Sequence, residues 1–92
     1  MNGIGKIVNH YSFENQLEQA IEEASEFILA AQKYKRFATQ KEELNLIEET
    51  ADLTIMMQQM RLYLGSSAVD YDIDRKLKRQ ILRIESEQRA EE

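Results

Sequence analysis

Two pairs of acidic residues have the spacing that places side chains on one face of a helix: Glu23 with Glu26, and Glu49 with Asp52. Residues three apart on a helix share a face, so each pair offers carboxylate oxygens to one point. In an antiparallel helical hairpin, positions whose residue numbers have the same sum lie level with each other. Glu23 with Asp52 has the same sum as Glu26 with Glu49. We therefore expect four carboxylates at one level of a hairpin.

Four carboxylates at that density favour a bound cation. Like charges raise one another's pKa values and repel, and a hard divalent cation with oxygen ligands relieves the repulsion. Mg²⁺ ranks ahead of Ca²⁺ and Mn²⁺, and it would keep coordination positions for a phosphate and a water. The alternative is a solvated acidic surface, because 17 acidic residues produce many such pairs by chance. A carboxylate-bridged di-iron site is disfavoured, since it usually needs Glu-x-x-His and the chain has one histidine.

The elements that would position these carboxylates are helices. The chain has no proline, only three glycines and a 3-4 spacing of apolar residues, which predict an all-α fold. Ser12 and Thr39 have the character of N-caps, Thr39 in a capping box with Glu42, and Gly65 has that of a left-handed stop. The predicted helices span residues 13–36, 39–64 and 71–88, with a turn centred between Phe37 and Ala38, a short polar connection over 66–70, and one helical turn at 6–10.

Within the first long helix, the predicted buried stripe includes three alanines and several larger apolar residues. It runs through Phe13, Leu17, Ala20, Ile21, Ala24, Phe27, Ile28 and Ala31. The second half of the next helix is more apolar than one buried face requires. We expect a partner chain to cover the surface of Met56, Met57, Met60 and Leu64.

Length and charge limit the class of protein. Ninety-two residues make a single domain over 1–92, with an ordered core of about 12–88, and a core of that size is marginal, so a homo-oligomer is expected. The net charge of −5 opposes nucleic-acid binding. The absence of cysteine fits a cytoplasmic protein, and no stretch is apolar enough for a signal peptide or a membrane span, so no membrane partner is expected.

The residues around the two acidic pairs resemble a known family. Glu22-Glu23-Ala24-Ser25-Glu26, followed after 22 residues by Glu49-Thr50-Ala51-Asp52, resembles the EExxE…ExxD signature of the MazG-like all-α nucleoside triphosphate pyrophosphohydrolases. The flanking runs 15–17 and 47–57, with 76–79 in the last helix, are similar to those of short phage-type or bacterial members. The likeness covers roughly residues 12 to 85.

The resemblance implies a fold, a reaction and a set of site residues. The fold would be a helical hairpin plus a third helix, completed as a bundle by dimerisation, and the enzyme would hydrolyse an NTP or dNTP to the monophosphate and pyrophosphate. Mg²⁺ would be the cofactor, with Mn²⁺ a possible substitute. The metal ligands would be Glu23, Glu26, Glu49 and Asp52, with Glu22, Glu23 and Glu49 as the catalytic carboxylates.

An anionic substrate also needs cations. Lys76, Arg79 and Arg83 recur at helical spacing and are the expected phosphate-binding residues, with a solvated basic face as the alternative. A dimer or a tetramer is the expected assembly. The competing function is a non-catalytic helical interaction or regulatory module whose acidic cluster is only a surface.

Overall fold

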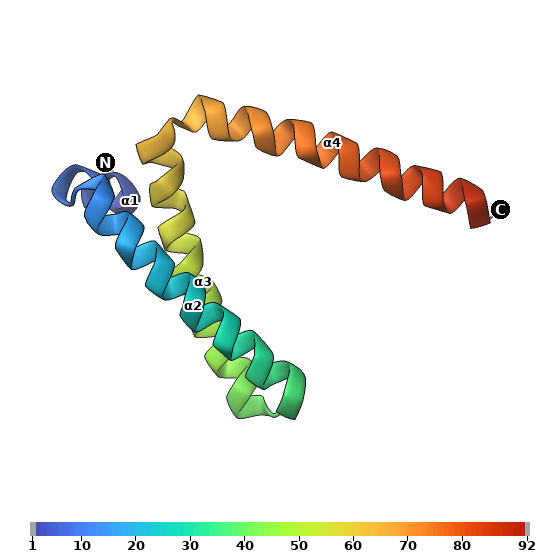
Figure 1. Ribbon diagram of the computed structural model, residues 1–92, viewed down its shortest axis with the longest axis horizontal. Coiled ribbons are helices and arrows are strands. Elements are labelled where there is room, and N and C mark those ends of the chain that lie inside the picture. The colour runs from blue at the N-terminus through green and yellow to red at the C-terminus, as the bar shows by residue number, and fades with distance from the viewer. Residues whose placement is uncertain (1, 92) are drawn as a thin grey trace.

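The computed structural model describes residues 2–91, which form four helices and no strand. They are α1 (Gly3–His10), α2 (Phe13–Phe37), α3 (Gln40–Leu64) and α4 (Ser66–Glu91). Figure 1 shows α2 and α3 side by side as a hairpin, α1 near the open end of that hairpin, and α4 projecting from it as an arm. The all-α class is therefore confirmed. No helix within residues 2–91 is long and apolar enough to cross a membrane.

The turn between α2 and α3 has the position and the chemistry expected. Helix α2 ends at Phe37, and Ala38 adopts a left-handed conformation with φ 50° and ψ 35°. Thr39 caps α3, because its hydroxyl oxygen accepts a hydrogen bond of 3.3 Å from the backbone N–H of Glu42. Ser12 caps α2 in the same way, accepting from Asn15 at 3.1 Å. Two residues thus reverse the chain and set the register of the hairpin.

A buried pair of glutamines shows which residues of α2 and α3 lie level with each other. The Nε2 of Gln16 on α2 donates a hydrogen bond of 2.7 Å to the Oε1 of Gln59 on α3, and both side chains are buried. The numbers of these two residues have the same sum as those of the two acidic cross-pairs. The contact therefore shows, independently of the carboxylates, that the hairpin pivots between Phe37 and Ala38.

The core of the hairpin is small and built largely from alanine and methionine. Ala20 packs with Met56 and Met60, with Tyr63 against this cluster, and Ala30 is buried nearer the turn. The predicted stripe on α2 was partly wrong, because Leu17, Ile21 and Ile28 remain exposed. The small side chains of Ala20 and Ala30 face α3 instead, which lets the two helices approach closely.

The expected partner surface on α3 also needs correction. Met56 is buried inside the hairpin and is not available to a second chain, whereas Met57 and Leu64 are exposed, and Met60, although largely buried, still lines an apolar groove beside α4. The α3 helix is apolar on more than one side, and the pattern alone did not identify which methionines face α2.

Helix α1 is longer than the single turn expected at residues 6–10. Asn2 caps it by accepting a hydrogen bond of 2.8 Å from the N–H of Gly5, so the helix begins at Gly3 despite the two glycines. The segment that follows is fastened to α3, since the hydroxyl of Tyr63 donates to the carbonyl of Tyr11 at 2.7 Å and the Phe13 and Tyr63 rings lie 5.5 Å apart. These contacts hold the amino-terminal end of α2 against α3.

Helix α4 begins five residues earlier than predicted, so the expected connection over 66–70 is wrong. Gly65 alone joins α3 to α4, with a φ of 104°, and its carbonyl accepts from the N–H of Val69 at 3.2 Å to start the new helix. A bidentate ion pair between Arg61 and Asp70, with bonds of 2.8 and 2.6 Å, spans the corner. The left-handed stop expected at Gly65 is confirmed only in the sign of φ, because its ψ of 110° lies outside the left-handed helical region. This conformation, which glycine adopts most readily, turns the chain within one residue.

The resulting shape is open. The radius of gyration is 17.1 Å, whereas a compact chain of this length would have about 12 Å. The difference comes from α4, which diverges from the hairpin after its first turns (Figure 1). Large apolar side chains on α4 are exposed in consequence, among them Leu77, Ile81 and Leu82.

Candidate metal centre

Three of the four predicted carboxylates converge in the middle of the hairpin. Glu23 on α2 and Glu49 and Asp52 on α3 each offer an oxygen, and these oxygens lie within 4.8 Å of one another. Glu23 and Glu49 are half-buried and Asp52 is exposed. The register of the hairpin brings these residues level, as the spacing predicted, so the cluster depends on the two-residue turn at Ala38 and Thr39.

Two of the carboxylate oxygens in this cluster are buried without a hydrogen-bond partner. These are the Oε2 atoms of Glu23 and Glu49. The other oxygen of Glu23, Oε1, accepts a bond of 3.2 Å from the Nε2 of Gln19, one turn earlier on α2. Buried acceptors without a donor are costly, and a cation with oxygen ligands would satisfy both. The residues present therefore fit a hard divalent cation.

Electrostatics points in the same direction. Desolvation by burial raises the pKa of Glu23 above its ordinary value, and the neighbouring charges of Glu26 and Asp52 raise it further, while the hydrogen bond from Gln19 opposes them. A raised pKa means that the fold disfavours the charged carboxylate relative to the same group in water. A proton or a metal ion can provide the positive charge that this position lacks.

The fourth predicted ligand, Glu26, stands at the edge of the cluster. It is exposed and lies outside the group of three, although its charge acts on Glu23. Glu22 is also exposed on α2. Glu23 lies on the face of α2 that packs against α3. Glu22 and Glu26 lie to either side of that face and therefore point toward solvent. Their assignment as a ligand and as a catalytic carboxylate stays a prediction.

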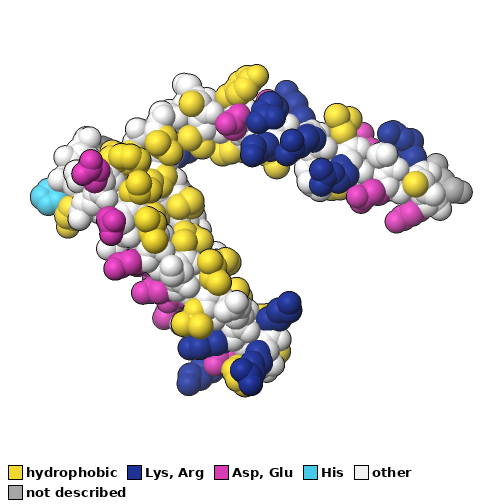
Figure 2. Space-filling model, in the orientation of Figure 1, with side chains coloured by type: hydrophobic (Ala, Val, Ile, Leu, Met, Phe, Trp, Pro, Cys, Tyr) yellow, Lys and Arg dark blue, Asp and Glu magenta, His cyan; other side chains and the backbone are white. Residues whose placement is uncertain are grey.

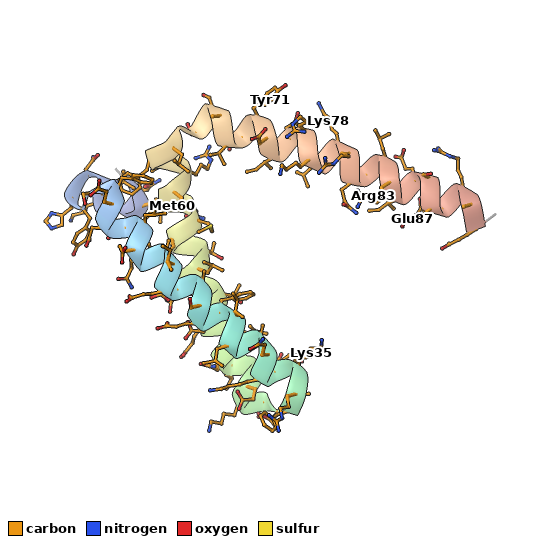
Figure 3. All side chains as sticks on the ribbon, in the orientation of Figure 1. Lys35, Met60, Tyr71, Lys78, Arg83 and Glu87 are labelled. Carbon is orange, nitrogen blue, oxygen red and sulfur yellow. The ribbon has the colours of Figure 1, made fainter. Side chains whose placement is uncertain are left out.

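The three predicted phosphate-binding residues lie on α4. Lys76, Arg79 and Arg83 are exposed there, and within residues 2–91 they take part in no ion pair, whereas Arg75 pairs with Asp72 and Lys78 with Asp74. Figure 3 shows Lys78 and Arg83 along the arm, well away from Met60 in the hairpin. One chain by itself thus does not bring the basic segment to the carboxylates.

Two polar contacts near the cluster escaped the sequence reasoning. Gln19 stands four residues before Glu23, a spacing at which a glutamine can bond a carboxylate on a helix. The buried pair of Gln16 and Gln59 could have been found by applying the register rule to all polar residues rather than to acidic ones alone.

Comparisons of the chain with protein-family models, with curated proteins and with solved structures found no match. What the residues do must therefore be argued from the carboxylate cluster and its surroundings.

Proposed function

We propose that the protein is a Mg²⁺-dependent nucleoside triphosphate pyrophosphohydrolase that converts an NTP or dNTP to the monophosphate and pyrophosphate. The observation that carries this proposal is the convergence of Glu23, Glu49 and Asp52 with two buried, unpartnered oxygens. The motif resemblance supplies the reaction, and the geometry supports the cation that such a reaction needs. Mn²⁺ is the expected substitute because it also accepts carboxylate ligands.

The acidic residues would have two roles, binding the cation and positioning the attacking water. Glu23, Glu49 and Asp52 would hold the cation between α2 and α3. When bound, Mg²⁺ would neutralise charge on the phosphate oxygens and acidify a water. Glu26, exposed beside this cluster, stays the predicted fourth ligand, and Glu22, also exposed, would orient that water and accept its proton.

The triphosphate needs further positive charge. Lys76, Arg79 and Arg83 are the available cations, because no carboxylate of residues 2–91 pairs with them. Since α4 points away from the carboxylates of its own chain (Figure 1), a contribution from these residues would come from another copy. We propose a homo-oligomer as the active form for this reason.

A pyrophosphate-release assay over common and modified nucleotides, with and without Mg²⁺, tests the activity. Glu49→Gln and Asp52→Asn should each lower turnover by more than about 100-fold, because losing even an outer-shell partner of a metal costs roughly 10–100-fold. Glu48→Gln is the matched control, since Glu48 is exposed next to Glu49 and outside the cluster. It should keep near-normal turnover.

Metal binding can be measured separately from hydrolysis. Mg²⁺ or Mn²⁺ should raise the melting temperature of the wild-type chain and of Glu48→Gln, but not that of Glu49→Gln. Stabilisation without hydrolysis of any nucleotide would retain the metal site and refute the activity. If Mg²⁺ produces no stabilisation and no nucleotide is hydrolysed, the non-catalytic helical module is favoured instead.

A further inference from the structure

The angle between α3 and α4 contains an apolar groove that no side chain of residues 2–91 fills. Its volume is about 650 Å³, and its walls include Phe27 from α2, Leu53, Met57 and Leu64 from α3, and Ile73 from α4. Figure 2 shows hydrophobic side chains along the inner side of this angle. None of the three clustered carboxylates lines this groove, whereas Met60 of the hairpin core forms part of its floor.

The arm continues the apolar wall of this groove. Ile73, Leu77, Ile81 and Ile84 recur at spacings of four and three, so they form one stripe on α4, and they are 43–57% exposed. Beyond Ile73, no other helix of the described residues 2–91 packs against the stripe (Figure 1). A stripe of this kind is the face that a helix normally buries against another element.

The amount of exposed surface is that of a chain separated from a partner. The solvent-accessible surface is 7424 Å² for a chain of 10.8 kDa, whereas a compact monomer of this mass exposes about 5,500 Å². The excess is therefore about 1,900 Å² per chain, within the range of about 1,000–2,500 Å² that each chain buries in a large or obligate dimer interface.

Charge selects a second copy of this chain as the occupant. Residues 75–83 contain five basic and no acidic side chains, while α2 and α3 together carry ten acidic and five basic ones. Lys76, Arg79 and Arg83 have no ion-pair partner within residues 2–91. Helix α4 as a whole carries six basic and six acidic side chains, so its positive charge is confined to this middle segment. An apolar helix with a basic middle segment complements an apolar groove on an acidic hairpin, and one chain contains both, which is the requirement for a two-fold symmetric contact.

We propose that two copies exchange their arms: α4 of each chain lies with its apolar stripe in the groove between α3 and α4 of the other. The exchange buries the stripe and the groove together and brings the basic segment of one chain to the acidic hairpin of its partner. The proposed exchange rests on the groove, the stripe, the exposed area and the charges. Its link to the proposed function is that it names the surface by which the oligomer forms.

Mass measurement tests the exchange without reference to catalysis. Light scattering on wild-type protein should give twice the mass of one chain, and Leu77→Asp and Met57→Asp should each shift the population to monomer. Leu82→Asp and Leu44→Asp are the matched controls, because Leu82 and Leu44 are at least as exposed but lie outside the stripe and the groove. A monomeric wild-type protein would refute the proposal, and so would variants at Leu77 and Met57 that remain dimeric.

A crosslinking measurement keeps the test decisive if a charged variant disturbs folding. A photoreactive phenylalanine analogue replaces Met57 in a mixture of isotope-labelled and unlabelled chains. The peptide that contains position 57 of one chain should be crosslinked to a peptide from residues 71–91 of the other, so that the product contains one labelled and one unlabelled peptide. Crosslinks confined to one chain, or between chains at other segments, would overturn the exchange. An inactive but dimeric and crosslinked protein would refute the proposed hydrolase while leaving the exchange intact.

Discussion

At the scale of single residues, Glu23 is the position where structure and chemistry conflict. Its side chain lies on the packed face of α2, level with the alanine core, and its Oε2 is buried without a donor. A chain optimised only for stability would place an apolar residue there. Retaining a carboxylate at this level is the kind of local cost that accompanies ligand binding.

Replacing Glu23 by glutamine should stabilise the metal-free fold at neutral pH. The folded state raises the pKa of Glu23 above 4.5, so the contribution of this carboxyl to stability is complete at acidic pH and is lost as the pH rises through the raised pKa. Glutamine does not titrate, so the advantage of Glu23→Gln should grow over that interval. We expect about 0.2–0.5 kcal/mol, the size of a like-charge pair on a helix.

Denaturant titrations between pH 3 and pH 8, in chelator and again in Mg²⁺, provide the measurement. In excess Mg²⁺ the wild-type chain should become more stable than Glu23→Gln, since the variant lacks one of the three clustered carboxylates. Glu22→Gln is the control, because Glu22 is exposed on the same helix and outside the cluster. A Glu23→Gln variant that is less stable than wild type in chelator at neutral pH would contradict this account of the carboxyl.

The carboxylate cluster was largely predictable from sequence, and its edge was not. Spacing from the turn brings Glu23, Glu49 and Asp52 level whatever the side chains around them, because a helix has a fixed rise per residue. The rotation of α2 about its own axis, which decides the residues that face α3, does not follow from the rise per residue. Apolar residues occur on several sides of α2, so the pattern included Ala20 but did not reveal that Ala30 is buried, that Leu17, Ile21 and Ile28 are exposed, and that Glu26 turns outward.

At the scale of elements, the hairpin is held in register by a polar contact as well as by packing. The bond between Gln16 and Gln59 lies in the buried seam of α2 and α3, and the Oε1 of Gln16 accepts a further bond of 3.0 Å from Asn15. A shift of one residue along either helix would break this bond and leave amide groups buried without partners. The pair thus helps to keep the carboxylates at one level.

A double-mutant cycle on this pair should show strong coupling. Gln16→Met alone removes the donor to the Oε1 of Gln59, which is only 2% exposed, and should cost about 1–3 kcal/mol because a buried acceptor is left unsatisfied. The double variant Gln16→Met/Gln59→Met should lie much closer to wild type. Chemical denaturation of the four proteins gives the coupling energy.

Gln32→Met provides the control for helix propensity and side-chain length, since Gln32 is exposed on α2 and lies outside the groove. Single variants whose effects simply add would show that the two glutamines act independently. In the double variant we also expect weaker stabilisation by Mg²⁺, because an apolar pair tolerates other registers better than a hydrogen-bonded pair.

Element boundaries followed the local chemistry where the chain has a strong signal. Ser12 and Thr39 cap the helices that they were expected to cap, and the turn follows Phe37. The start of α4 was predicted too late because two serines and an aspartate resemble a loop. In the structure Asp70 is inside the helix and bonds Arg61 across the corner, a tertiary contact that a local pattern does not contain.

At the scale of the whole molecule, the open shape determines how the chain responds to its own concentration. Helix α4 contacts the rest of its chain near the Gly65 corner and is exposed along most of its 26 residues. Isolated helices are marginal in water, and most helical stability in proteins comes from packing of an apolar face. The arm therefore depends on a second chain for much of its stability, while the hairpin has its own small core.

Hydrogen exchange should reveal this difference. In concentrated protein, the amides of α4 and of the hairpin should both be protected, and dilution should release those of α4 first, because dissociation is favoured by mass action. The measurement is mass-spectrometric exchange over a hundredfold range of protein concentration. Equal protection of α4 at every concentration would show that the arm needs no partner.

The single-residue corner at Gly65 then has a kinetic consequence. Folding of the α2–α3 hairpin needs only contacts within one chain, whereas fixing α4 needs an encounter between two chains, so assembly should have a first-order and a second-order phase. A newly made chain would pass through a stage with a formed hairpin and a loose, protease-sensitive arm. The lifetime of that stage would shorten as copies accumulate, which makes survival of the protein depend on its own abundance.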